Sequence, residues 1–157
     1  MMRIRHLTVL AAIALLTAIP AIAKVAPENW NPPLTTAQRA VGLFVAVCGK
    51  SLPDFANAEA LMANYGIVLT SRIGTATKFS TIENVSFQIQ PHMGGNHCSM
   101  VFETGDSQAA VKKAFSAIGK TKVVNGNLAA SYGGRAVAVL ETTSSPKAYH
   151  LFMLGAP

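Results

Sequence analysis

The chain has 157 residues and carries thirteen Lys and Arg against seven Asp and Glu, a formal net charge of +6. Half of the residues are apolar, and only two are cysteines. This length gives one ordinary domain, and the modest charge lacks the basic stripe and interleaved aromatic residues of nucleic-acid-binding proteins. Nucleic acid is therefore excluded as an expected partner.

Residues 1–23 have the three-part pattern of a secretory signal peptide. Arg3 and Arg5 make the start basic, an uncharged apolar run covers residues 7–19, and small residues precede a cleavage point after Ala23. The alternative is an uncleaved anchor that holds the protein at a membrane surface, but the run is shorter than the roughly 20 residues that usually span a bilayer. We expect a periplasmic or secreted protein with no transmembrane segment after cleavage.

A proline-rich stretch, residues 24–34, predicts an extended leader because proline is incompatible with a helix interior. Residues 35–157 then form a single predicted domain. Its first helix is expected to begin near Thr35, which has capping-box spacing to Gln38. Apolar residues at helical spacing predict the buried face of this helix: Ala37, Val41, Phe44 and Cys48.

A second helix is predicted to open at residues 51–54, where a serine is followed by an early proline and an acid, and to end at Gly66. Its predicted apolar stripe comprises Phe55, Ala58, Leu61, Met62 and Tyr65. Short segments with the composition of strands follow, over residues 67–73, 77–82 and 85–90.

Residues 91–96 are predicted to form a loop, and residues 97–103 a strand. A period of two sends Cys98, Met100 and Phe102 to one face of this strand and the intervening side chains to the other. A third helix is expected to start at Gly105–Asp106. It should bury Val111, Phe115 and Ile118 and expose Lys112 and Lys113.

The remaining residues, 121–157, predict β-structure with turns at Asn125–Gly126 and Gly133–Gly134. Residues 135–143 and 147–154 should form the last hairpin. The whole pattern favours an α+β fold: an antiparallel sheet with about three helices packed on one face, stapled by one disulfide.

Cys48 and Cys98 are the predicted disulfide. Cysteine pairs oxidise and persist in exported proteins, and both positions fall on faces that their neighbours mark as apolar. Two buried free thiols, or a bond to another chain, are the alternatives.

His92, Met93, His97 and Cys98, joined by His150, are the only candidates for a metal or catalytic site, since imidazole, thioether and thiolate suit copper and zinc. Three observations argue against this site. His97 and Cys98 are neighbours on a strand and should point to opposite faces. Cys98 is expected in the disulfide, and the spacing matches no structural zinc pattern. We therefore assign no catalytic residue, metal or cofactor.

Four lysines make a small basic face that could dock an acidic partner, although a solvated surface is the ordinary role of such residues. They are Lys112, Lys113, Lys120 and Lys122.

The sequence predicts an exported, non-catalytic protein that binds a protein, an envelope component or a small molecule. A metal-binding protein or an enzyme using the His92, His97 and Cys98 region is the alternative.

Cleavage is predicted after Ala23, so the intact mass of the exported protein should correspond to a chain that begins at Lys24. A mature product that retains residues 7–19 would establish the anchor instead.

Overall fold

The computed structural model describes residues 35–73, 76–80, 84–92, 95–134, 136–143 and 147–155. The predicted signal peptide and leader, residues 1–34, lie outside these ranges. The helices are α1 (Ala37–Phe44), its π-helical continuation η1 (Val45–Gly49), α2 (Ala58–Asn64) and α3 (Gln108–Ser116). The strands are β1 (Val68–Ile73), β2 (Ala76–Ser80), β3 (Val85–His92), β4 (Gly95–Glu103), β5 (Thr121–Val124), β6 (Asn127–Tyr132), β7 (Ala136–Thr142) and β8 (Ala148–Leu154). None of the helices in these ranges is long and apolar enough to cross a membrane.

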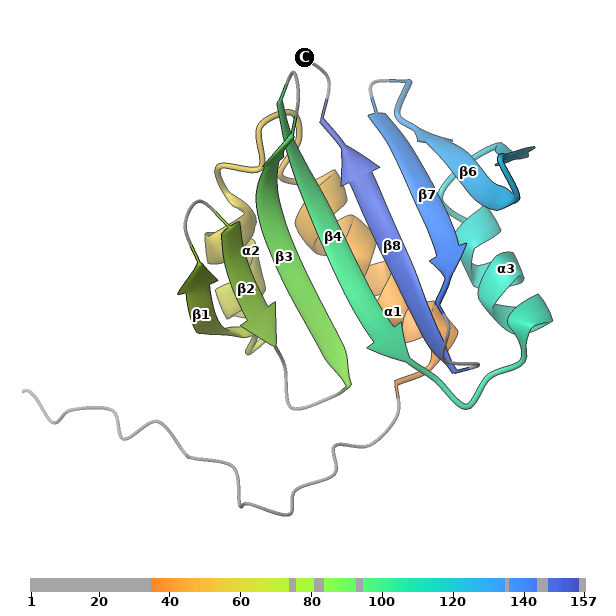
Figure 1. Cartoon of the computed structure of the whole chain (residues 1–157), viewed down its shortest axis with the longest axis horizontal. Coiled ribbons are helices and arrows are strands. Elements are labelled where there is room, and N and C mark those ends of the chain that lie inside the picture. The colour runs from red at the N-terminus through yellow and green to blue at the C-terminus, as the bar shows by residue number, and fades with distance from the viewer. Residues whose placement is uncertain are drawn as a thin grey trace, which may run out of the picture. The chain divides into compact units, whose positions relative to one another are not determined.

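The described strands form one eight-stranded antiparallel sheet in the order β1-β2-β3-β4-β8-β7-β6-β5. Two four-stranded meanders, β1–β4 and β5–β8, meet where β4 pairs with β8. Figure 1 shows α1 and α2 behind the sheet and α3 beside β7; along the chain, α3 connects β4 to β5, the strand at the far edge. The predicted α+β class and the β7–β8 hairpin are confirmed.

The core gathers around the middle of the sheet, where β4 and β8 alternate in register. Cys98, Met100 and Phe102 are fully buried, and their partners on β8 are Met153, Leu151 and Tyr149. Phe44 from α1 and Phe115 from α3 are buried in the same cluster. The period of two that was predicted for β4 is therefore confirmed.

The first helix begins one residue later than predicted, because Thr36 caps it. Its hydroxyl oxygen accepts a hydrogen bond from the Arg39 N–H at 3.2 Å. The Asp106 carboxylate accepts a second orphan N–H of this helix, that of Ala37, at 2.7 Å. Asp106 was expected to open the third helix, but Ser107 is the cap there. The predicted buried face of α1 and η1 is confirmed.

The second helix was predicted to start at residues 51–54, and this is wrong. The Ser51 hydroxyl donates back to the Val47 carbonyl at 2.6 Å, so it extends the preceding helix instead of capping a new one. Phe55 has a φ of +60°, which interrupts any helix there, and α2 starts at Ala58. Tyr65 was predicted to be buried, yet it is 46% exposed because it lies past the last helical turn.

The predicted loop over residues 91–96 is largely paired, since β3 and β4 remain in register out to His92 and Gly95. The Asn125–Gly126 turn is confirmed: both residues have positive φ, as a two-residue hairpin of type I′ requires.

Phe115→Ala should destabilise the fold by about 3–5 kcal/mol, because the Phe115 ring is completely buried and its removal leaves a cavity. Chemical denaturation measures the free energy of unfolding. Lys112→Ala on the exposed side of the same helix is the matched control, with an expected change within about 0.5 kcal/mol. Equal losses in the two variants would mean that this helix is oriented differently.

Candidate functional site

The disulfide joins the helical layer to the centre of the sheet. Cys48 lies in η1 and Cys98 in β4, their Cα atoms are 5.6 Å apart, and both residues are fully buried. The predicted pairing is confirmed. Cys98 consequently has no thiolate to offer a metal or a substrate.

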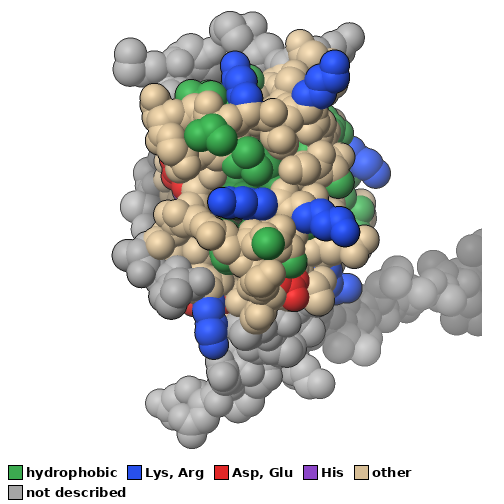
Figure 2. Space-filling model, turned by 90° about the vertical axis from the view of Figure 1, so that its right-hand side faces the viewer, with side chains coloured by type: hydrophobic (Ala, Val, Ile, Leu, Met, Phe, Trp, Pro, Cys, Tyr) green, Lys and Arg blue, Asp and Glu red, His purple; other side chains and the backbone are tan. Residues whose placement is uncertain are grey.

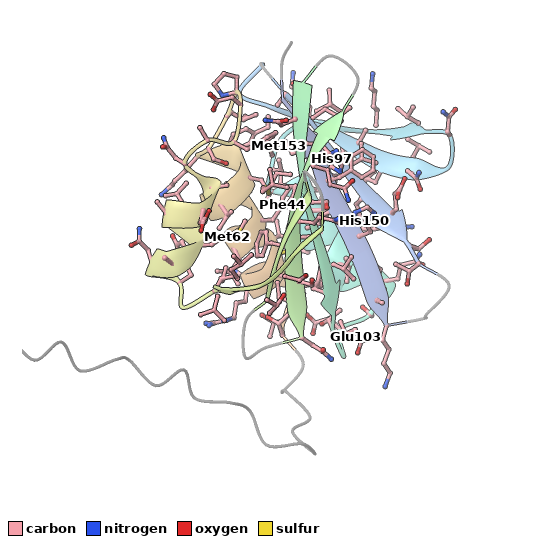
Figure 3. The ribbon with its side chains drawn as sticks, turned by 60° about the vertical axis from the view of Figure 1, so that its left-hand side comes forward. Phe44, Met62, His97, Glu103, His150 and Met153 are labelled. Atoms are coloured by element: carbon pink, nitrogen blue, oxygen red, sulfur yellow. A yellow bond between two sulfur atoms is a disulfide. The ribbon has the colours of Figure 1, made fainter. Side chains whose placement is uncertain are left out.

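His97 and His150 lie on the face of the sheet opposite to Cys98, which we call the Ser99 face. His97 pairs with Leu154 and His150 with Val101, so three cross-strand pairs lie between the two histidines, and only Ser99 with Phe152 is on the same face. At about 3.3 Å per residue, four residues along a strand place them about 13 Å apart. Figure 3 shows both histidines on the side of the sheet away from Phe44 and Met62.

The predicted metal cluster is therefore not assembled by these residues. Within the described ranges, no group of three or more His, Cys, Asp and Glu side chains is placed to hold a metal ion. Met93 and the side chain of His92 lie outside what the structure describes. The prediction of a site in the His92–Cys98 region thus gains no support from the residues that are described.

A short polar chain crosses three strands on the Ser99 face. The Glu141 carboxylate lies 3.3 Å from His150 Nδ1 through one oxygen and accepts a hydrogen bond from the Asn127 amide at 3.2 Å through the other. His150 also contacts the Phe152 ring, with centroids 5.6 Å apart. With both of its oxygens engaged, the Glu141 carboxylate links β6, β7 and β8 on this face.

A groove between α1 and α3 has a volume of about 780 Å³. Small and apolar side chains make up most of its walls, among them Val41, Ala114 and Ile118. Of its charged residues, Asp106 already accepts the Ala37 N–H. The groove therefore offers few polar groups that could orient a small molecule.

The edge of the sheet at β5, like the opposite edge at β1 with Val68 and Leu69, exposes apolar side chains. All four of its residues are exposed, Val123 by 73% and Val124 by 42%. β5 pairs with β6 on one side, and no described strand covers the other. The edge therefore combines unpaired backbone groups with exposed apolar side chains.

A shallow hollow of about 370 Å³ adjoins this edge. Its lining includes Lys120 and Lys122 from the β5 side and Ser131 and Val137 from β6 and β7. Val137 is itself 45% exposed. Figure 2, which faces this side of the molecule, shows Lys and Arg side chains spread among apolar ones, with acidic side chains only near the margins.

Sequence reasoning noted the lysines of this surface but not the valines beside them. Lys112 and Lys113 are exposed on α3, as predicted. The missing information was the position of β5 at an edge, since a central strand with the same residues would hide Val123. An apolar pair next to Lys120 and Lys122 was the available signal.

No known protein family matches the chain, and neither a curated protein nor a solved structure is similar to it. The arguments on function accordingly rest on its own residues.

Replacing both cysteines by alanine should lower the free energy of unfolding by about 4 kcal/mol, because the bond closes a loop with a sequence separation of 50 residues. For a domain of this size the melting temperature should fall by more than about 10 °C. Adding a reductant should destabilise the native protein and leave the Cys48→Ala/Cys98→Ala variant unchanged. Two thiols that alkylate freely in the native protein would disprove the bond.

Proposed function

We propose that the chain is an exported, non-catalytic binding protein that docks a protein partner at the β5 surface. This surface is defined by Lys120, Lys122, Val123, Val124 and Val137. The proposal includes the one-sided architecture expected from sequence, with helices on one face of the sheet and the Ser99 face left open. Export is supported by the signal-peptide pattern of residues 1–23 and fits a structural disulfide.

The observation that carries the proposal is the exposure of Val123 and Val124 on an uncovered edge strand. Apolar side chains scattered singly on a surface need no explanation, but here Val123 and Val124 are neighbours on the same edge strand. A strand edge is also a ready template for a partner's backbone. The combination supports binding of another chain at this place.

A protein partner accounts for these features better than a small molecule does. The hollow is open, and its polar groups are two lysines with long, flexible side chains and the small hydroxyls of Thr121 and Ser131. Small-molecule sites usually enclose most of the ligand and orient it with convergent polar groups. Protein interfaces, by contrast, combine apolar and charged side chains over an open surface, and both kinds are exposed along β5.

A photo-cross-linking residue in place of Val123 should capture a discrete partner in cells that export the protein, because this side chain is the most exposed valine at the edge. The same residue in place of Tyr65, which is also exposed but lies at the end of α2, is the control. Cross-linked species are resolved by mass on denaturing gels.

The Val123 adduct should weaken when Lys120 and Lys122 are both reversed to Glu. Identical adducts from the two positions, or none from Val123, would reject the β5 surface as the docking site.

A further inference from the structure

We infer that the β5 surface recognises an extended acidic segment of the partner, which adds to the sheet as a further strand beside β5. This inference rests on the proposed function and specifies the chemistry of the partner. It follows from which backbone groups of β5 point outward and which side chains flank them.

The hydrogen-bond register of the β5–β6 hairpin identifies the outward backbone groups. The Ser131 N–H donates to the Lys120 carbonyl at 3.4 Å, so Lys120 directs its backbone toward β6. Antiparallel strands alternate in this respect, so Lys122 and Val124 do the same. The N–H and C=O groups of Thr121 and Val123 therefore point to the free edge, where an incoming strand would bond them.

Side chains on β5 alternate in the same register. Lys122 lies opposite Ala129 on the Ser99 face, whereas Val123 lies opposite Leu128 on the helix side. A strand added beside β5 would place alternate side chains against the Lys120 and Lys122 ammonium groups, where Asp or Glu pairs best. The residues between them would meet Thr121 and Val123. The pattern recognised is thus an acid at every second position, with apolar or β-branched residues between.

The surrounding charge favours the same partner. Lys112 on α3 lines a small cleft beside Gly126 and Asn127 at the tip of the hairpin, which adds a third ammonium group on the helix side. A second copy of this chain is disfavoured, since two β5 strands paired about Lys122 would bring like charges together. Anionic lipid would satisfy the lysines but not the row of backbone groups at Thr121 and Val123.

The test uses the full exported chain and four synthetic peptides of eight residues. The first alternates Glu with Val and Thr, and the second replaces every Glu by Lys. The third and fourth have the sequence of the first with alternate amides N-methylated, one starting at an odd position and the other at an even position. The acidic peptide should bind, and the lysine peptide should not. One N-methylated peptide should bind at least about tenfold more weakly than the other, because only alternate amides of an added strand face β5.

Amide hydrogen exchange locates the added strand. At saturating acidic peptide, exchange of the Thr121 and Val123 amides should slow by at least about tenfold, whereas Lys122 and Val124, already turned toward β6, should change little. Uniform slowing, or none, would overturn strand addition.

Two variants separate the contributions of backbone and charge. Val123→Pro removes one outward N–H, a change tolerated at a strand edge, and should abolish peptide binding while the melting temperature stays near that of the native protein. Lys120→Glu/Lys122→Glu should weaken binding by about tenfold or more without altering the backbone. Lys50→Glu/Lys147→Glu, with the same change in net charge at two other exposed lysines, is the matched control and should bind normally.

Failure of the inference is distinguishable from failure of the proposed function. If Val123 still cross-links a partner while no acidic peptide binds, the surface functions but the recognised chemistry is different. If vesicles containing anionic phospholipid bind through Lys120 and Lys122 and the acidic peptide does not, lipid is the ligand and the inference is rejected. If Val123→Pro does not weaken peptide binding but added salt does, the site is only a charged surface and strand addition is rejected.

Discussion

The pairing of β4 with β8 is the interaction on which the rest of the structure depends. It joins two meanders that are each continuous in sequence, and it places the fully buried Met100 opposite Leu151 at the centre of the sheet. Because β8 occupies this central place, β5 becomes an edge, and the exposed valines there are a direct result of the strand order.

Local patterns in the sequence predicted the buried faces correctly where neighbouring residues determine the structure. The alternation around Cys98 gave the correct faces of β4, and the helical spacing through Phe44 and Cys48 gave the buried side of α1 and η1. Those two assignments together also pointed to the disulfide. Periodicity is reliable in these cases because each element has one clearly buried face.

Other features depend on contacts that no local pattern encodes. The start of α2 was missed because the left-handed backbone of Phe55 is imposed by its surroundings, whereas the residues before it resemble a helix start. Asp106 has the sequence position of a cap for its own helix, but its carboxylate instead accepts the N–H of Ala37, 69 residues away in the sequence. The exposure of β5 was missed for the same reason, because it is a property of the sheet order and not of its four residues.

The Asp106 contact has a consequence for a chain that is synthesised from its N-terminus. Ala37 is synthesised early, yet the Asp106 carboxylate that accepts its N–H lies 69 residues later in the sequence. Cys98 likewise lies 50 residues after Cys48. With only two cysteines in the chain, intramolecular oxidation has a single possible product. The N–H of Ala37 therefore gains this partner only after about two-thirds of the chain has been synthesised, and oxidation in that interval cannot trap a wrong pairing within the chain.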